Sequence, residues 1–403
     1  MSTSPIAIEL LRDVLQPTLG RARTLPAEAY TSQRVFDWEA LHLFEQGWVC
    51  VGRAEDLSSP GDQRAFRIGN EGILAVRGND GELRGFYNTC RHRGHELLEP
   101  ETSRNLRAIK CPYHAWVYSL EGELAAAPRF GDLEGFDKQG YPLVAARIHE
   151  WGGWVFVNAD GSAPAFEEHV GNLDDLLAPW EPHRLFAAET HRYEISANWK
   201  TITENYHECY HCPSIHPALC DVTPVESGRN VAHDGLWVGG NMELKDFAET
   251  MSMTGESGGV PIRGLDASQR RQVCYIGLFP NLLISLHPDY VMTHRIEPIA
   301  PGRTAIECRW LFPPEAKERP DFSPAYASEF WDITNREDWL ACESVYRGLQ
   351  SSGFHQGPFA WSEDEVHIFM AMVARAYVDG SASTPPQVHE PDAAGAGTAP
   401  RHF

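Results

Sequence analysis

Two mixed cysteine and histidine pairs stand close together in the first half of the 403-residue chain. Cys90 and His92 form one pair, Cys111 and His114 form the other, and each pair lies where a predicted strand gives way to a tight loop. Two thiolates can hold one iron of a 2Fe-2S cluster while two imidazoles hold the other iron. A zinc site is the metal alternative, but zinc fingers usually pair Cys with Cys and His with His. The pattern therefore favours a 2Fe-2S cluster over zinc or over incidental residues.

A second group of potential ligands lies between Glu208 and His216. Glu208 and His211 are three residues apart, so a helix would place both on one face. Pro213 is expected to end that helix, which brings His216 in from the next turn and lets the two imidazoles converge. Two histidines and one carboxylate leave open positions on a ferrous ion, where O2 can bind. Residues 208–216, here called the iron-binding run, predict a mononuclear Fe(II) site whose third ligand comes from another part of the chain.

Asp338 is the predicted third ligand. It lies in a helix expected from about Ser323 to Gln350, on an otherwise apolar stripe. An unpaired buried carboxylate is costly, and a metal ion is one of the few partners that removes the cost. An aspartate that pairs with an arginine or caps a loop is the alternative, and Glu337 and Glu343 are weaker candidate ligands. The apolar members of the stripe are Trp331, Cys342, Val345 and Leu349.

The remaining cysteines carry weaker signals. Cys209 and Cys212 form a C-x-x-C pair inside the iron-binding run, but neither a preceding strand nor a second C-x-x-C accompanies them. We interpret both as packing residues near the iron. The total of nine cysteines is odd, and no disulfide framework is expected.

The surrounding elements predict an α+β protein with two main domains. Residues 46–160 show short β-rich pieces between turn signals, which indicates an antiparallel domain, and residues 161–379 mix strands with helices. Residues 1–45 are expected to be helical and to pack on the second domain, and residues 380–403 to be disordered. Strands are predicted at 65–68, 73–77, 83–88, 191–196, 272–286 and 291–298, with helices starting near 198 and spanning 323–350.

Charge and composition exclude several classes of partner. The chain has 34 Lys and Arg against 56 Asp and Glu, and its net charge of −22 would repel nucleic acid and anionic membranes. No apolar run approaches the ~18 residues of a membrane span, and the first residues do not form a secretory signal. We expect a cytoplasmic protein that binds neither nucleic acid nor membrane.

Together, the motifs resemble the oxygenase α subunits of the Rieske non-heme iron oxygenases, the ring-hydroxylating family. The resemblance runs from about residue 30 to 375 and rests on C-R-H-R-G, C-P-Y-H-A-W, N-W-K, E-N-Y-H-E-C-Y-H-C-P-S-I-H-P and the Glu337-Asp338 pair. It implies a Rieske antiparallel β-sandwich domain joined to a helix-grip catalytic domain with a curved antiparallel sheet and a long C-terminal helix. The interval between the two Cys and His pairs is slightly long, which implies a one-residue insertion.

The resemblance also implies roles for single residues and an assembly. In a head-to-tail homotrimer, Glu208 would bridge His211 and His114 of the partner subunit and so carry electrons between subunits. Asn205 would support the iron site. The sequence contains neither a G-x-G-x-x-G fingerprint nor a ferredoxin C-x4-C-x2-C motif, so NAD(P)H electrons must arrive through a separate reductase, with or without a ferredoxin.

The implied activity is that of a terminal oxygenase, either a mono- or a dioxygenase, that hydroxylates a small substrate with O2. Glutamate at the bridging position looks most like members that N-demethylate quaternary amines such as betaines. Hydroxylation, dihydroxylation or O-demethylation of an aromatic compound is the alternative, and an electron carrier that holds only the cluster is a lower one. Aromatic residues that would form a cation–π cage, or that simply belong to the core, are Trp237, Tyr275, Phe279 and Tyr290.

Overall fold

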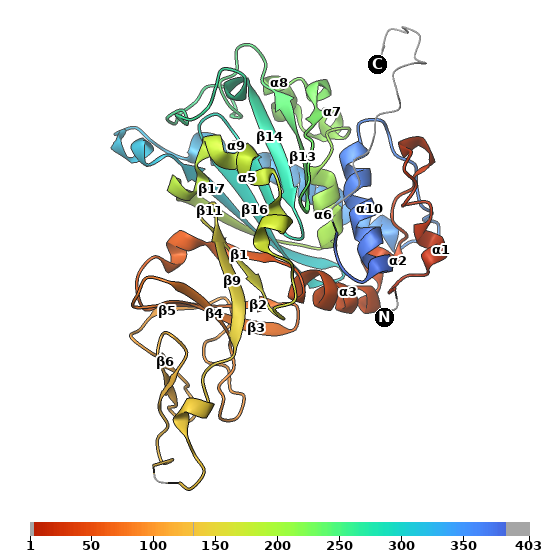
Figure 1. Ribbon diagram of the computed structural model, residues 1–403. Helices are drawn as coiled ribbons and strands as arrows, with labels where there is room; N and C mark the ends of the chain where they lie inside the picture. The colour runs from red at the N-terminus through yellow and green to blue at the C-terminus, as the bar shows by residue number, and fades with distance from the viewer. Residues whose placement is uncertain (1–3, 132, 384–403) are drawn as a thin grey trace.

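The computed structural model describes residues 4–131 and 133–383, which form two lobes and an N-terminal helical segment (Figure 1). The predicted disordered tail lies outside the described residues except for 380–383. Among the described helices, none is long and apolar enough to cross a membrane.

The smaller lobe consists of short antiparallel strands. They are β1 (Val49–Arg53), β2 (Asp62–Ile68), β3 (Glu71–Arg77), β4 (Leu83–Tyr87), β5 (Ser103–Asn105), β6 (Ile109–Lys110), β7 (Val117–Tyr118), β8 (Leu124–Ala126), β9 (Ala145–Trp151) and β10 (Trp154–Asn158). A seven-stranded sheet has the order β1-β10-β9-β4-β3-β2-β5, and β6, β7 and β8 form a separate three-stranded sheet. This small sheet lies in the part of the lobe that projects away from the larger lobe (Figure 1).

The larger lobe contains a curved antiparallel sheet in the order β11-β17-β16-β15-β14-β13-β12. Its strands are β11 (Phe186–Ile195), β12 (Arg229–Asn230), β13 (Trp237–Glu243), β14 (Gln272–Leu278), β15 (Leu282–Leu286), β16 (Val291–Ala300) and β17 (Arg303–Phe312). The predicted β segment 272–286 is therefore two strands, β14 and β15, joined by a turn. The sequence reasoning did not anticipate β13 or β17.

Helices cover both faces of this sheet. They are α4 (Phe166–Val170), α5 (Leu173–Leu177), α6 (Trp199–Tyr206), α7 (Cys212–Ile215), α8 (Pro217–Val222), α9 (Ala325–Leu349) and α10 (Asp364–Asp379). Side chains alternate between the faces along each strand. Val273 packs into one core with Ile202 of α6 and Phe369 of α10, whereas Cys274 packs with Phe166 of α4. The α+β fold class, with a long helix in the second domain, is confirmed.

The N-terminal segment is joined to the larger lobe by a buried ion pair. Its helices are α1 (Ile8–Leu11), α2 (Glu28–Thr31) and α3 (Gln33–Glu39). Lys200 at the start of α6 donates to Glu39 at 2.6 Å, and both side chains are almost completely buried. Glu39 also accepts hydrogen bonds from the Trp199 indole at 3.0 Å and from the Tyr377 hydroxyl. These bonds connect α3, α6 and α10, so they hold the helix that leads into the iron-binding run.

Glu39→Ala is expected to lower the free energy of unfolding by about 3–5 kcal/mol, because it leaves the Lys200 ammonium buried and unpaired. Denaturant unfolding measures this change. Asp37→Ala on the exposed side of α3 is the matched control and should stay within about 0.5 kcal/mol of the wild type. Equal losses in both variants would contradict a special role for the buried pair.

Candidate iron and iron-sulfur sites

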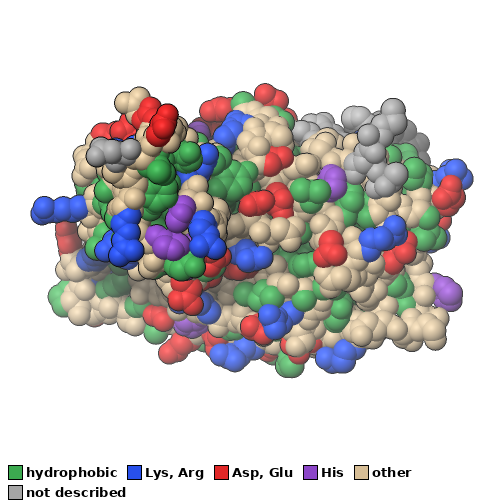
Figure 2. Space-filling view, turned by 90° about the horizontal axis from the view of Figure 1, so that it is seen from below, with side chains coloured by type: hydrophobic (Ala, Val, Ile, Leu, Met, Phe, Trp, Pro, Cys, Tyr) green, Lys and Arg blue, Asp and Glu red, His purple; other side chains and the backbone are tan. Residues whose placement is uncertain are grey.

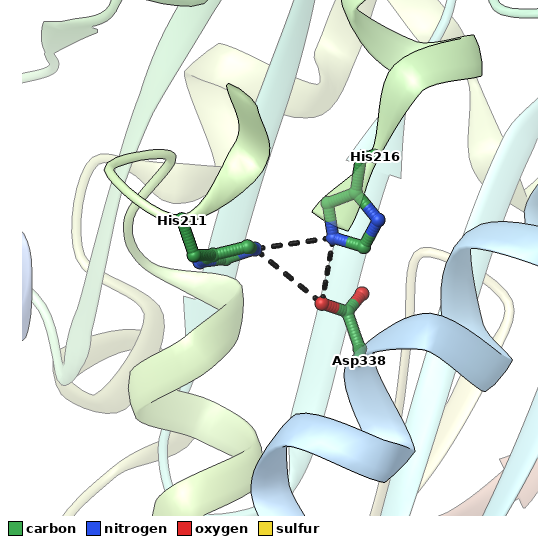
Figure 3. A group of neighbouring side chains, drawn as sticks. All are labelled: His211, His216 and Asp338. Carbon is green, nitrogen blue, oxygen red and sulfur yellow. Dashed lines mark hydrogen bonds and ion pairs between the residues drawn. The ribbon is translucent and has the colours of Figure 1, made fainter. Parts of the chain in front are cut away.

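Three potential metal ligands converge between the iron-binding run and α9 (Figure 3). His216 Nε2 lies 2.8 Å from Asp338 Oδ1 and 3.1 Å from His211 Nε2. His211 Nε2 lies 3.4 Å from the same Asp338 oxygen. Two imidazole nitrogens and a carboxylate oxygen that face one common point are the donor set that suits a ferrous ion with open positions.

The charge around these residues also favours a cation. Burial lowers the pKa of His211, but the carboxylates of Asp338 and Glu208 outweigh burial and raise that pKa to about 9. Burial likewise opposes the charge on Asp338, and its hydrogen bonds with His211 and His216 hold its pKa below the ordinary value. The site is thus rich in negative charge, and the residues present fit a divalent iron ion.

The predicted helical path through the iron-binding run is wrong in detail. Helix α6 ends at Tyr206, so Glu208 and His211 lie in the turn that follows it and not on one helical face. Pro213 does not end a helix but sits in the first turn of α7, and His216 follows the last residue of α7. Proline is tolerated in a first helical turn because its missing N–H has no helical partner there. The short helix α7 therefore brings the two histidines together.

Each histidine is held by a carboxylate on its other ring nitrogen. His211 Nδ1 contacts Glu208 Oε1, and Glu208 Oε2 accepts a hydrogen bond from the His211 backbone N–H at 3.1 Å. His216 Nδ1 lies 2.7 Å from Glu337 Oε2. Such carboxylates fix the orientation of a metal-binding imidazole and raise its basicity. Asn205 Nδ2 lies 3.5 Å from His211 Nε2, beside the same site.

Glu337→Gln is expected to weaken Fe(II) binding by about 10- to 100-fold, because the neutral amide supports the His216 imidazole less well. Competition with a chelator under anaerobic conditions measures the affinity. Glu343→Gln is the matched control on α9, since Glu343 only accepts from the Ser196 backbone N–H at 2.9 Å. An unchanged affinity in Glu337→Gln would contradict the role of Glu337.

The predicted apolar stripe around Asp338 is only partly correct. Trp331, Cys342 and Leu349 are buried, and the Asp338 side chain is 16% exposed. Val345 is 52% exposed and does not belong to the stripe. The buried face of α9 continues to Leu349, but Val345 lies at its edge and points to solvent.

The two Cys and His pairs lie on neighbouring loops of the smaller lobe, between β4 and β5 and between β6 and β7. Cys90 and Cys111 are buried, and the rings of His92 and His114 are 4.7 Å apart. His92 Nδ1 is buried without a hydrogen-bond partner among the residues that the structure describes. An unpartnered buried nitrogen, a second histidine ring close to it and two buried thiols on the same pair of loops fit the ligand set of a Rieske-type 2Fe-2S cluster.

The rim of these loops is basic and partly exposed. Arg91 and Arg93 are exposed, Tyr113 is 54% exposed, and its ring lies 3.7 Å from that of His114. Figure 2 shows histidine side chains beside Lys and Arg side chains on the projecting lobe. This end of the lobe is therefore accessible to another protein surface.

Sequence models of two families match successive parts of the chain. That of the Rieske [2Fe-2S] domain matches residues 47–137, and that of the ring hydroxylating alpha subunit (catalytic domain) matches residues 182–379. The carnitine monooxygenase oxygenase subunit of Escherichia coli (strain K12) is 33% identical over 337 residues, 83% of this chain and 86% of that protein. The chain belongs to the Rieske non-heme iron oxygenases.

Other relatives agree with this assignment. The glycine betaine monooxygenase oxygenase subunit of Chromohalobacter salexigens is 29% identical to this Rieske oxygenase over 366 residues, 84% of this chain and 82% of that protein. The crystal structure of the quaternary ammonium Rieske monooxygenase CntA with L-carnitine has a TM-score of 0.75 and 27% identity, covering 94% of this chain and 100% of that one. Naphthalene 1,2-dioxygenase from Rhodococcus sp., 19% identical with a TM-score of 0.75 over 93% of this chain and 97% of that one, shares the fold.

These findings confirm the resemblance inferred from the motifs. They also confirm the oxygenase class and the combination of a 2Fe-2S cluster with a non-heme iron in this Rieske oxygenase. A protein that only carried electrons would need the Rieske domain alone, so the alternative of an electron carrier does not explain the catalytic domain or its converging ligands.

Cys209 and Cys212 of this Rieske oxygenase are joined by a disulfide, with Cα atoms 4.9 Å apart. Cys212 does pack in the core at the start of α7 and Cys209 packs against it, but their bond was not predicted. The bond closes the turn between Glu208 and α7. The spacing C-x-x-C was a usable signal, because residues three apart are close both on a helix and across a tight turn.

Of the four predicted cage residues, Tyr275 and Tyr290 both contact Trp331, which donates a hydrogen bond to the Tyr290 hydroxyl at 2.8 Å, whereas Trp237 and Phe279 lie elsewhere. Trp237 packs on the α4 side of the catalytic sheet, and the Phe279 ring packs near Trp199 at 6.2 Å. Tyr275 lies on the face covered by α6 and α9, where its ring is 6.3 Å from that of Trp331. Tyr206 was not among the predicted cage residues. It directly follows Asn205, and its ring lies 5.8 Å from that of Tyr275.

Proposed function

We propose that this Rieske oxygenase is the terminal component of a multicomponent system that N-demethylates a quaternary amine such as a betaine. The main observation for this proposal is a row of three aromatic rings that begins at Tyr206, directly after Asn205. Tyr206, Tyr275 and Trp331 follow one another at ring distances of 5.8 and 6.3 Å. Aromatic faces attract a cation such as a trimethylammonium group. The relatives that act on glycine betaine and carnitine support the same substrate class.

Two of the three rings are partly exposed, whereas Trp331 is buried behind them. Tyr206 and Tyr275 both keep some exposed surface although they lie between the catalytic sheet and its helices. The Tyr206 hydroxyl is 2.9 Å from Ser285 Oγ, which fixes its ring against β15. A quaternary amine held against these rings would have its N-methyl groups next to Asn205 and the metal ligands.

The protein residues hold and orient the reactants. Cys90, His92, Cys111 and His114 would hold the cluster, and His211, His216 and Asp338 would hold the iron. When bound, these groups supply the electrons and the activated oxygen that hydroxylate an N-methyl carbon, after which the hydroxymethyl group leaves as formaldehyde. Glu208 connects the His211 imidazole to the protein surface, where its side chain is 14% exposed.

We further propose a head-to-tail homotrimer in which the cluster of one subunit serves the iron of the next. The small sheet beside the cluster loops and helix α7 lie at opposite ends of one chain (Figure 1). Electrons move poorly over such a span, so a second copy has to bring its cluster close. The basic rim around His114 suits the partly exposed carboxylate of Glu208. A separate reductase, with or without a ferredoxin, delivers NAD(P)H electrons, and we place the system in the cytoplasm, away from membranes and nucleic acid.

A substrate panel tests the function. The enzyme, reconstituted with iron, cluster and a reductase, is incubated aerobically with carnitine, glycine betaine, other betaines and aromatic acids. We expect formaldehyde and substrate-dependent NADH oxidation in a ratio near one with at least one betaine. Coupled turnover of aromatic compounds alone would overturn the quaternary-amine assignment and favour ring hydroxylation or O-demethylation.

A further inference from the structure

The disulfide between Cys209 and Cys212 surrounds part of the iron site. The two cysteines enclose only Tyr210 and His211, and His211 is one of the converging ligands. Glu208 directly precedes the first cysteine, and helix α7 begins with the second. The bond therefore joins the residue two positions before the iron ligand to the residue directly after it.

The same turn holds the carboxylate of the proposed electron bridge. Glu208 Oε2 accepts hydrogen bonds from the backbone N–H groups of Tyr210 and His211, and Glu208 Oε1 contacts His211 Nδ1. Both donating N–H groups lie inside the disulfide loop. Any change in the backbone of this loop must therefore move Glu208 relative to His211.

A stabilising role alone does not explain this bond. Disulfides stabilise proteins mainly by closing long loops in the unfolded chain, and this one closes a loop of minimal length. C-x-x-C pairs are instead a frequent arrangement of reversible redox cysteines. Only this disulfide is present among the described residues, and the other seven described cysteines are free.

The pair is placed to react with small oxidants and reductants. Tyr210, between the two cysteines, is 64% exposed, and Cys209 is partly exposed, so the loop lies at the surface. Cys212 is buried, and its Sγ lies 3.9 Å from His211 Nε2. One sulfur is thus reachable from solvent while the other lies beside the metal ligand.

We propose that Cys209 and Cys212 form a reversible redox switch that sets the geometry of the electron bridge. Hydrogen peroxide oxidises the two thiols to the disulfide and is itself reduced to two molecules of water. A dithiol reductant reverses the change and becomes a disulfide itself. The disulfide holds Glu208 against His211, and reduction frees the turn and slows electron delivery. This inference rests on the proposed role of Glu208 and adds regulation to it.

The test compares the holoenzyme in both thiol states. Mass spectrometry after alkylation measures the disulfide, and iron content and the cluster spectrum are recorded alongside. We expect reduction by a dithiol to lower the rate of cluster oxidation during turnover by about 10-fold, with both metal centres retained, and peroxide to restore it. The Cys209→Ser and Cys212→Ser variants should show the slow rate in every condition. Cys220→Ser, outside the turn, is the matched control and should respond like the wild type.

Two results would overturn the switch. One is a pair that stays as thiols in the holoenzyme after peroxide treatment, which mass spectrometry detects without any activity. The other is a disulfide that forms and breaks while the rate of cluster oxidation stays constant. If the enzyme does not act on quaternary amines, the proposed function fails but the switch can still be tested. The thiol titration and the single-turnover rate with any coupled substrate remain measurable.

Discussion

Glu208→Gln should lower steady-state turnover by about 100-fold while the cluster spectrum and the iron content stay at wild-type values. Glutamine keeps the shape of the side chain and one acceptor oxygen. It replaces the oxygen that faces either the His211 imidazole or the loop N–H groups with an amide that can only donate. The amide cannot hold His211 and accept from a histidine of the partner subunit at the same time, so electrons should reach the iron slowly.

Rapid mixing of the reduced enzyme with O2 and substrate measures this step directly, because oxidation of the cluster changes its absorption. Glu363→Gln is a matched control because Glu363 is a neighbouring acid. Burial and the charge of the nearby Glu208 raise the pKa of Glu363. Glu363→Gln removes a comparable acid without touching His211 and should oxidise its cluster at nearly the wild-type rate. Wild-type activity in Glu208→Gln would exclude the bridge.

The three predicted iron ligands converge in the structure, but the local structure that brings them together could not be predicted from the sequence. Residues three apart meet on a helix and also across a tight turn, so the spacing of Glu208 and His211 fits both. Proline is excluded from helix interiors and accepted in first turns, so Pro213 marks either the end or the start of a helix. The Cys209–Cys212 bond closes within this turn, and the spacing of the two cysteines alone did not distinguish a disulfide from two free thiols.

Glu337 and Asp338 illustrate a second limit. Both acids reach His216, one at Nδ1 and the other at Nε2, because the two nitrogens lie on different edges of one ring. From helical spacing alone, Glu337 and Asp338 are alternative candidates for the same role, the third iron ligand. The structure gives them different roles, and only the placement of His216 between them distinguishes the two.

Long-range geometry decides which aromatic rings lie on the side of the catalytic sheet where we propose the substrate binds. Side chains alternate between the two faces along a strand, so the position in the strand decides whether Trp237 or Tyr275 faces the iron. A shift of one residue in register would move each side chain to the opposite face. In the structure, Trp237 pairs with Leu278 and shares its face, while Tyr275 pairs with Ser285 on the other face. The sequence places these residues in strands, and only the assembled sheet orients them.

Asp338→Ala and Cys111→Ala are each expected to lower turnover by about 1,000-fold or more, yet an assembly that contains both variants should be active. Asp338→Ala removes an iron ligand and keeps the cluster, whereas Cys111→Ala removes a cluster ligand and keeps the iron site. In a head-to-tail ring, the cluster of one subunit faces the iron of the next. Random co-assembly then places an intact cluster against an intact iron at about a quarter of the junctions.

Co-expression with two affinity tags isolates the mixed assembly, and light scattering gives its mass. Isolation removes the trimers of a single variant, and each mixed trimer has one productive junction among three, so we expect about a third of the wild-type turnover per chain from the isolated assembly. The two variants purified separately and mixed without subunit exchange should remain inactive, which controls for residual activity in either one. An inactive mixed trimer with intact cluster and iron in the respective subunits would mean that electrons cross within one chain. Because neither variant contains both centres, turnover by the mixture can arise only at a junction between subunits.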